Sequence, residues 1–504
     1  MKTFKPLFLT LFALLFTTLA FAQNVEKYGI FEFSRKGTAS GNPFKDVQLS
    51  AEFTFKNRTY FTEGFYDGNG VYKVRFMPDE EGEWTFRTTS NAKELNGRTG
   101  KFRCTPSSPS NHGLVKVRDN HHFGYADGTP FYPVGTTCYG WVWQGDELVN
   151  QTLETLSKPA FNKIRMTVMP KNYDVYINTD PHVFPFEGSK EKGWDFSRFN
   201  PAYFQYLEDK IAKLGALGIE ADLILFHPYD YGKWNFDKAS QEEYGHYLRY
   251  ALARLGAYRN IWWSMANEYD LMKKPDEEWE QYFRTIQTYD PYGHLSSIHN
   301  GMAWYNHSKP WITHLSVQTP YLESIQDWRK LYNKPVVIDE FVYEGNIPND
   351  WGNLTPEETV NRFWIIWARG AYGTHGETYI HPQNILWWSK GGKLYGKSPE
   401  RLAFLHKIMA EAPKEGLYPF HNLWNKETYL IKDNAYYLFY YGNSQQALAR
   451  LRLPEKGKYR LEVIDAWNMT VTPVEGLFSG RTEIPLPGRP YVAVRAVAVE
   501  PAGL

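Results

Sequence analysis

The stretch Asn260-Ile-Trp-Trp-Ser-Met-Ala-Asn-Glu-Tyr-Asp270 decides how the rest of the chain is interpreted. Its first part is an apolar, aromatic run of the kind that forms a fully buried strand. The run ends in the polar pair Asn267-Glu268, and barrel enzymes present catalytic acids in this way, at the carboxyl end of a strand. A second run, Pro335-Val-Val-Ile-Asp-Glu-Phe341, places Glu340 in a similar position. The remaining sequence must show whether Glu268 and Glu340 can face each other.

Strand-like and helix-like segments alternate over the central part of the chain. Asn200-Pro201 supplies a helix cap followed by proline at the first helical position, and Gly218 ends the same helix. The pattern predicts a (β/α)8 TIM barrel over residues 113–413, in which Glu268 ends the fourth strand and Glu340 the seventh. The predicted strands span 131–137, 162–168, 219–227, 260–268, 295–300, 312–318, 336–341 and 377–381.

The segments on either side of the barrel have a different pattern. Residues 24–106 contain short runs of alternating polar and apolar residues, separated by turn sequences such as Asp67-Gly-Asn-Gly70. Residues 420–504 return to the same alternation. We therefore predict an α/β protein in which an N-terminal and a C-terminal β-sandwich domain flank the barrel.

The N-terminus has the features of a secretory signal. Lys2 and Lys5 precede an apolar stretch, and Ala20-Phe-Ala22 offers a small-x-small cleavage site. No cysteine follows to carry a lipid anchor, and no later run approaches the length of a membrane helix. We expect residues 1–22 to be a signal peptide and the mature protein to be periplasmic or extracellular, without a membrane span.

The composition excludes some partners. Lys plus Arg and Asp plus Glu are balanced at 56 each, so the chain lacks the basic excess typical of nucleic-acid binders. Aromatic residues make up 17%, which fits either a large core or surfaces that stack on sugars. Cys104 and Cys138 could form a disulfide, but we favour two buried free thiols.

Motifs for other chemistries are missing from the sequence. There is no Gly-x-Gly-x-x-Gly after a strand, no phosphate-binding loop and no serine in a nucleophile elbow. We therefore expect neither a cofactor nor a metal. Two carboxyl groups at strand ends instead suit the retaining hydrolysis of a glycosidic bond, which needs them about 5–5.5 Å apart.

The two strand ends resemble those of clan A of the retaining glycoside hydrolases. Two further stretches, Gly128-Thr-Pro-Phe-Tyr-Pro-Val-Gly135 and Gly376-Glu-Thr-Tyr379, the latter followed by Trp387-Trp388, are similar to its apiosidase-like branch. That branch often has β-sandwich domains at both ends. The resemblance implies that Glu268 is the acid/base, that Glu340 is the nucleophile, and that Asn267 hydrogen-bonds the 2-hydroxyl of the sugar.

Three further positions are interpreted from the same resemblance. Arg165 on the second strand would lie beside the nucleophile and keep Glu340 ionised, with a structural ion pair as the alternative. Tyr321, after the sixth strand, would hydrogen-bond the nucleophile. Alternation along the strand puts Asp339 on the opposite face from Glu340, where we expect a structural bond outside the pocket.

Aromatic and histidine side chains near the strand ends are candidates for contacts with the sugar. Trp388 is the expected stacking platform, with Trp141 as a second aromatic in the cleft, and one residue of the pair Trp387-Trp388 is expected to face the core. His227 and His299 would bind sugar hydroxyls unless they are ordinary core histidines. Glu377 is a third carboxylate near the mouth of the barrel and the main rival for a catalytic role.

These patterns together predict an exported retaining glycoside hydrolase that acts on a carbohydrate partner. The alternative is a catalytically inactive carbohydrate-binding protein that is built on the same barrel.

Overall fold

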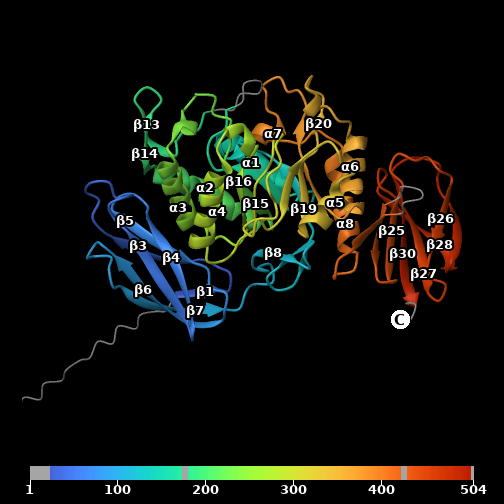
Figure 1. Cartoon of the computed structure of the whole chain (residues 1–504), viewed down its shortest axis with the longest axis horizontal. Helices are drawn as coiled ribbons and strands as arrows, with labels where there is room; N and C mark the ends of the chain where they lie inside the picture. The colour runs from blue at the N-terminus through green and yellow to red at the C-terminus, as the bar shows by residue number, and fades with distance from the viewer. Residues whose placement is uncertain (1–22, 173–179, 422–427, 501–504) are drawn as a thin grey trace, which may run out of the picture.

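A barrel of eight parallel strands lies at the centre of the molecule, between an N-terminal and a C-terminal β-sheet region (Figure 1). The computed structural model describes residues 23–172, 180–421 and 428–500; the predicted signal peptide lies outside them. The barrel strands follow one another around the ring in chain order, and an isolated bridge between His299 and Ser316 links the fifth to the sixth. They are β11 (Val134–Thr137), β12 (Lys163–Thr167), β15 (Glu220–Phe226), β16 (Ile261–Ala266), β17 (Ser296–Ser297), β18 (Leu315–Gln318), β19 (Val336–Glu340) and β21 (Tyr372–His375).

Helices lie between most of the barrel strands. In α2, Asn200 accepts a hydrogen bond from the Ala202 amide and Pro201 occupies the first turn, while Gly218 adopts φ +72° after the end of the helix. These features confirm the predicted start and end of this helix. The helices are α1 (Asp146–Leu156), α2 (Pro201–Ala216), α3 (Gln241–Leu255), α4 (Asp276–Tyr289), α5 (Ile325–Tyr332), α6 (Pro356–Ala368), α7 (Trp387–Lys390) and α8 (Ser398–Ala410).

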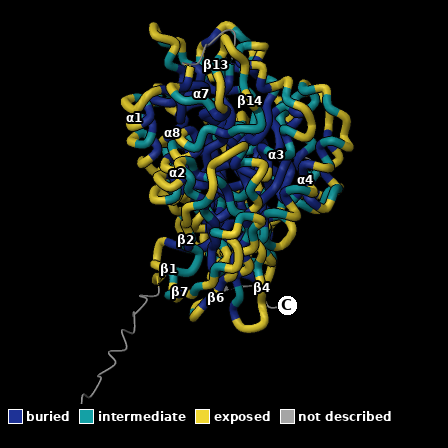
Figure 2. Tube along the Cα trace, turned by 90° about the vertical axis from the view of Figure 1, so that its left-hand side faces the viewer, coloured by how far each residue is buried: buried dark blue, intermediate teal, exposed yellow. Residues whose placement is uncertain are grey.

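The barrel strands are buried along their length because helices cover their outer faces. Every residue of β15 and β16 is buried, and Figure 2 shows buried chain concentrated inside the barrel and exposed chain at its outer surface. This burial on both faces explains the continuous apolar runs in the sequence. Within the described residues, no helix is long and apolar enough to cross a membrane.

One predicted barrel strand was wrong in position, and two others, the first and the sixth, begin three residues later than predicted. The eighth was expected at 377–381, but it is β21, whose sequence Tyr-Gly-Thr-His contains no apolar run to mark it. Glu377 lies instead in β22 (Glu377–Thr378), which pairs with β20 (Glu344–Gly345) outside the barrel sheet. The first strand begins at Val134 and the sixth at Leu315.

The residues before the first strand close the lower end of the barrel. They form a small antiparallel sheet of β8 (Val115–Arg118), β9 (His122–Tyr125) and β10 (Pro130–Phe131). The Phe123 ring packs against Trp262 and Tyr372, with centroids 5.2 and 5.5 Å away. This packing closes that end, so the open end is the one at the carboxyl termini of the strands.

The N-terminal region is a seven-stranded sheet. The predicted turn Asp67-Gly-Asn-Gly70 joins β4 to β5, and Gly68, Asn69 and Gly70 all have positive φ, as such a turn requires. Stacked rings of Phe53 and Phe76 lie in its core, and Arg75 contacts Glu208 of α2. The sheet order is β1 (Gln23–Glu26), β7 (Thr99–Thr105), β6 (Gly82–Ser90), β3 (Leu49–Phe55), β4 (Arg58–Tyr66), β5 (Val71–Phe76), β2 (Phe31–Lys36).

The C-terminal region contains a six-stranded and a two-stranded sheet that share one buried apolar cluster. The Tyr440 hydroxyl donates to Asn361 of α6 at 2.9 Å, which ties this region to the barrel. Cys104 and Cys138 are both buried free thiols, as predicted. The larger sheet has the order β23 (Tyr418–His421), β24 (Thr428–Lys432), β25 (Tyr436–Tyr440), β30 (Val492–Glu500), β27 (Lys458–Asp465), β28 (Thr470–Phe478), and the smaller one pairs β26 (Leu448–Arg452) with β29 (Arg481–Pro485).

Candidate active site

A pocket of about 490 Å³ opens at the carboxyl ends of the barrel strands. Glu268 and Glu340 both line it, together with Lys171, Gln318 and Trp388. The structure therefore brings the two predicted carboxylates into one cavity. They come from the fourth and seventh strands, the positions that the sequence pattern gives them.

Glu268 follows β16 directly and has a left-handed backbone, with φ 45° and ψ 54°. Such a conformation is uncommon for a residue with a side chain and is found most often at functional sites. The Gln318 amide donates to Glu268 Oε1 at 3.0 Å. Burial, followed by the charge of Glu340, raises the pKa of Glu268 to about 7. This carboxyl group can therefore carry a proton near neutral pH.

Glu340 ends β19 and has different neighbours. The buried Tyr139 hydroxyl donates a hydrogen bond to Glu340 Oε1. Burial, followed by the negative charge of Glu340, raises the pKa of Tyr343 well above its usual value, so that hydroxyl stays protonated beside the carboxylate. Val342, two residues on, has φ 77°, which is unfavourable for a β-branched residue. The chain is thus held in a strained turn next to Glu340.

Asn267 is linked to Glu340 through the Tyr139 hydroxyl. Its Oδ1 accepts from Arg165 Nη2 at 2.7 Å and lies 3.3 Å from the Tyr139 hydroxyl. The bond from Arg165 fixes which way the amide points, so its Nδ2 faces away from the arginine. Within the described residues that nitrogen has no hydrogen-bond partner, although Asn267 is only 1% exposed. A buried amide of this kind can donate to a ligand.

Arg165 does not bond directly to Glu340 in the structure. Its Nη1 forms ion pairs with Asp222 at 3.3 Å and with Asp339 at 3.2 Å, and Lys163 pairs with the same two aspartates at 2.8 Å each. The structural ion pair that was left open in the sequence is therefore the arrangement observed. Arg165 is linked through Asn267 to Tyr139, which lines the pocket.

Asp339 lies inside the barrel rather than on its outer face. Its partner Lys163 is on β12, and two strands separate β12 from β19 in the sheet, so the contact crosses the barrel interior. Ser316 and Thr374 also donate to it. Lys163 and Arg165 hold the pKa of Asp339 far below its usual value, despite burial. Its structural role fits the expectation, but its position within the barrel does not.

Lys171 is a pocket residue that the sequence did not reveal. Its Nζ lies over the rings of Tyr139, Tyr229 and Trp388, at 3.8, 4.3 and 4.3 Å from their centroids. Burial lowers the pKa of Lys171 to about 7, although Glu340 and Glu268 oppose that shift. Lys171 follows the second strand in Met-Pro-Lys, which is no known motif, so no local signal marks it.

The two tryptophans after the last strand face different environments, as predicted. Trp388 lines the pocket and packs edge-on against Tyr139, with centroids 5.8 Å apart. The Trp387 indole instead donates to Thr136 Oγ1 at 2.8 Å inside the core. Tyr139, from the loop after the first strand, contacts both Trp388 and Glu340.

Of the seven predicted substrate-binding residues, Trp388 lines the pocket, Asn267 and Arg165 lie in the buried network that Tyr139 joins to it, and the other four lie elsewhere. Trp141 is fully buried in the core, and His227 is a satisfied core histidine that accepts from the Tyr229 amide. His299 is buried beneath Glu340, with its Nε2 3.9 Å from Oε1. Tyr321 is 71% exposed, and the hydroxyl that bonds Glu340 is that of Tyr139. Periodicity places residues near strand ends but does not say which of them turn inward.

The rival carboxylate Glu377 is also absent from this pocket. It is 1% exposed and accepts hydrogen bonds from the Tyr395 and Gly396 amides. It lies with His375 and Glu344 in a separate buried cluster. This position removes Glu377 from the chemistry of the Glu268–Glu340 pair.

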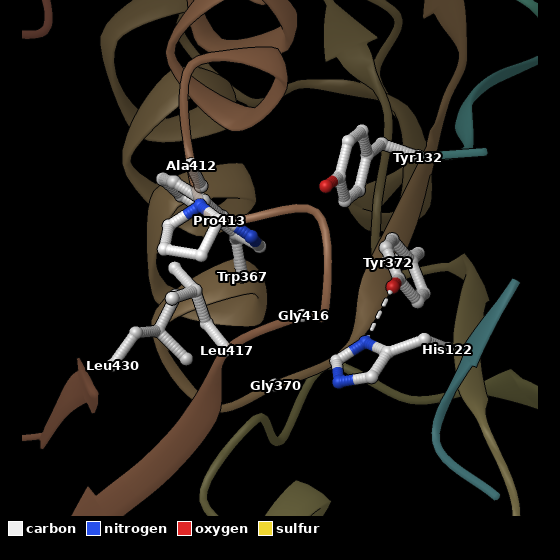
Figure 3. Close-up of a pocket in the computed structure, with 10 residues that line it drawn as sticks. All are labelled: His122, Tyr132, Trp367, Gly370, Tyr372, Ala412, Pro413, Gly416, Leu417 and Leu430. Carbon is white, nitrogen blue, oxygen red and sulfur yellow. Dashed lines mark hydrogen bonds between the residues drawn. The ribbon is translucent and has the colours of Figure 1, made fainter. Parts of the chain in front are cut away.

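A further pocket lies at the other end of the barrel (Figure 3). His122 and the first residue of β21, Tyr372, face each other there, with His122 Nδ1 3.1 Å from the Tyr372 hydroxyl. Apolar side chains, among them Leu417 and Leu430, form much of its wall. Burial lowers the pKa of His122 to about 3, so this pocket carries no charge and offers no acid/base pair.

The family follows from the match of the central region. A family described as "Apiosidase-like, catalytic domain" matches residues 118–428, more than half of the chain. The chain belongs to the apiosidase-like family. The regions flanking its apiosidase-like domain match two domains of unknown function, DUF5060 over residues 24–91 and DUF5605 over residues 424–497.

Solved structures resemble this apiosidase-like protein over most of its length. A protein from Bacteroides vulgatus, described as a candidate glycoside hydrolase, is 39% identical with a TM-score of 0.90, and the match covers 95% of this chain and 100% of the other. A glycoside hydrolase of family 5 from the same organism is 15% identical with a TM-score of 0.57, over 78% and 95% of the two chains. The second likeness shows a shared fold. None of the curated proteins matches the chain.

Proposed function

We propose that this apiosidase-like protein is a glycoside hydrolase that cleaves glycosidic bonds in oligo- or polysaccharides with retention of configuration. The observation that carries the proposal is the presence of Glu268 and Glu340 in one pocket with contrasting environments. A retaining mechanism needs one protonated and one ionised carboxyl group. Burial gives Glu268 a pKa of about 7, whereas Glu340 accepts a hydrogen bond from the buried Tyr139 hydroxyl.

In the first step of the proposed reaction, a Glu340 oxygen attacks the anomeric carbon of the sugar. The bond to the leaving oxygen breaks while Glu268 donates its proton to that oxygen. An ester between Glu340 and the sugar results. In the second step, Glu268 takes a proton from water, the water oxygen attacks the anomeric carbon, and Glu340 leaves as a carboxylate.

Neighbouring residues have supporting roles in this scheme. We assign Asn267 Nδ2 to the 2-hydroxyl of the sugar, because that nitrogen is buried and has no partner within the described residues. Arg165 positions Asn267 through its 2.7 Å hydrogen bond. Trp388 forms the wall against which an apolar sugar face would stack.

Export and domain organisation are part of the same proposal. Residues 1–22 would direct secretion, which suits an enzyme whose substrates are outside the cell. The N-terminal and C-terminal sheet regions would each fold as a β-sandwich around its own apolar cluster. These regions would support the barrel, or hold it on a polymer.

The test is a hydrolysis screen over aryl glycosides and plant, algal and microbial polysaccharides. We expect the wild type to release product from at least one substrate, and Glu340→Gln and Glu268→Gln to lose that activity while remaining folded. Glu323→Gln, which neutralises an exposed carboxylate outside the pocket, should keep it. Tight glycan binding without product from any substrate would contradict the proposal and favour the inactive carbohydrate-binding protein.

A further inference from the structure

A second group of ionisable side chains lies outside the pocket of Glu268 and Glu340. Glu344, His375 and Glu377 are each at most 1% exposed, and one ligand atom from each lies within 4.8 Å of the others. The shortest recorded approach is 3.8 Å, between His375 Nε2 and Glu344 Oε2. One imidazole and two carboxylates thus converge in the interior.

The backbone forces these side chains together. His375 ends β21 and Glu377 begins β22, so the two residues are two apart on extended chain and point to one side. β20 and β22 are parallel, and their register pairs Glu344 with Glu377. Like charges directly opposite each other on paired strands are destabilising. A compensating positive charge would remove that cost.

Both carboxylates are surrounded by hydrogen-bond donors. Glu377 accepts from the Tyr395 and Gly396 amides at 2.7 and 2.8 Å. Glu344 accepts from the Tyr379 hydroxyl, the Lys397 amide and the Ser398 hydroxyl. These amides and hydroxyls fix the orientation of both carboxyl groups, although burial still raises the pKa of Glu377 to about 8.

The charge of this cluster is not balanced by lysine or arginine. Across residues 23–172, 180–421 and 428–500, neither Glu344 nor Glu377 forms an ion pair with such a side chain. The interior aspartates of the barrel, by contrast, have Lys163 and Arg165. Buried carboxylates are ordinarily paired with a cation or bound to a metal.

His375 is oriented as a metal ligand would be. Its Nδ1 lies 3.3 Å from Thr136 Oγ1, and its ring stacks on Phe161 with centroids 5.0 Å apart. When Nδ1 donates its proton to the threonine, the lone pair of Nε2 faces the carboxylates. A metal-bound histidine typically has such a second hydrogen bond. Nε2 has no hydrogen-bond partner in the described part of the chain.

We propose that Glu344, His375 and Glu377 bind one divalent transition-metal ion, of the Zn²⁺ or Mn²⁺ type. Nitrogen and carboxylate ligands together suit these ions, whereas Ca²⁺ and Mg²⁺ prefer oxygen alone. Ligand distances of about 2.0–2.2 Å allow two ligand atoms to lie nearly 4 Å apart, which fits the 3.8 Å between His375 and Glu344.

The ion would have a structural role. Glu344 follows Tyr343, whose ring packs so closely on Gly376 that a Cβ there would lie 2.1 Å from it. Joining Glu344 to His375 and Glu377 would fix the segment that carries Tyr343 beside Glu340. This inference does not depend on the proposed hydrolase activity.

The test uses the full mature chain and the metals themselves. The metal content of the purified protein is measured by mass spectrometry, the ion is removed with a chelator, and Zn²⁺, Mn²⁺ and Ca²⁺ are titrated by calorimetry and thermal denaturation. We expect one Zn²⁺ or Mn²⁺ per chain and a rise in Tm of several degrees on binding, with a much smaller response to Ca²⁺.

Variants distinguish this site from other surfaces that bind metal. His375→Gln and Glu377→Gln should weaken binding by at least about 100-fold, whereas His122→Gln, which changes a buried histidine at the other end of the barrel, should leave it unchanged. If a variant fails to fold, the titration of the wild type alone decides. Absence of stoichiometric binding to the wild type, or equal binding by wild type and folded variants, would overturn the proposal. A proton shared between Glu344 and Glu377 would then reduce the repulsion between the two carboxyl groups.

Discussion

The barrel contains two pairs of carboxylates at different depths, and their neighbours differ. Asp222 and Asp339, in the interior, share two cations, Lys163 and Arg165, and all four side chains are fully buried. Glu268 and Glu340, at the strand ends, have a single nearby lysine, Lys171, whose own pKa falls to about 7. The pKa of Asp339 is held far below its usual range, while that of Glu268 rises to about 7.

The difference shows how one barrel can use carboxylates for two purposes. Lys163 and Arg165 hold the pKa of Asp339 far below its usual value, so the interior pair contributes structure and no proton transfer. In the pocket, burial and the charge of Glu340 raise the pKa of Glu268 to about 7, so this carboxyl group can hold a proton and release it. A carboxyl pKa raised in this way is typical of general acids in enzymes.

The largest expected effect is on turnover by the pocket pair. Glu340→Gln removes the proposed nucleophile and should reduce kcat/KM by at least about 1,000-fold, as expected for the loss of a covalent step. The measurement is the initial rate on the best substrate from the screen, alongside the thermal midpoint as a check on folding. A folded variant within tenfold of the wild type would remove Glu340 from the mechanism.

A substitution in the interior pair should lower the stability of the protein. Asp339→Asn leaves Lys163 and Arg165 with one uncompensated buried charge, which typically costs about 3–5 kcal/mol. Urea denaturation at pH 8 measures the loss. Asp327→Asn, which neutralises an exposed helix residue, should change stability by less than about 0.5 kcal/mol. Equal stability of the two variants would mean that the interior network is not the structural element inferred here.

Neutralising the carboxylate of Glu268 in the pocket should instead increase the stability of the protein. The pKa of Glu268 is about 7 in the folded protein and near 4.5 when unfolded, so the folded state binds more protons between these values. Ionising Glu268 in the folded protein therefore lowers its stability, and this loss is absent below pH 4.5 and complete above pH 7. Glu268→Gln avoids it and should therefore stabilise the protein by about 1–3 kcal/mol at pH 8. At pH 4 it should have little effect, and destabilisation at pH 8 would contradict the assigned environment.

The smallest effect concerns the pocket lysine. The Lys171 charge lowers the pKa of Glu268, so Lys171→Met should raise that pKa. The basic limb of the pH profile of kcat/KM should then move to higher pH by about one pH unit. Lys393→Met, at an exposed lysine, should leave the profile in place. A downward shift of the limb in Lys171→Met would show that Glu268 is not the acid.

The two glutamates and Asn267 could be predicted because long apolar strands end in them. Local periodicity carries that information, and chain order supplies the strand number. The partners of Arg165 could not be predicted in the same way, because Asp339 is three strands away and meets it only across the barrel interior.

The other wrong predictions concern short strands and loops whose sequences carry no periodic pattern. The eighth strand has four residues and no apolar run, so Glu377 was placed at the barrel mouth when it lies in another cluster. Lys171 and Tyr139 enter the pocket from loops, where side-chain direction depends on tertiary packing. For the same reason, Trp141 and His227 turned out to face the core.

The most direct test of the central claim is chemical rescue with azide, on an aryl glycoside that the wild type hydrolyses. In Glu340→Gly, azide can replace the missing nucleophile, and we predict a glycosyl azide whose anomeric configuration is opposite to that of the substrate. In Glu268→Gly, Glu340 still forms the covalent intermediate, and azide should give a product of retained configuration. The configuration is determined by NMR. The reverse pattern, with inversion in Glu268→Gly and retention in Glu340→Gly, would contradict the assignment of the two glutamates.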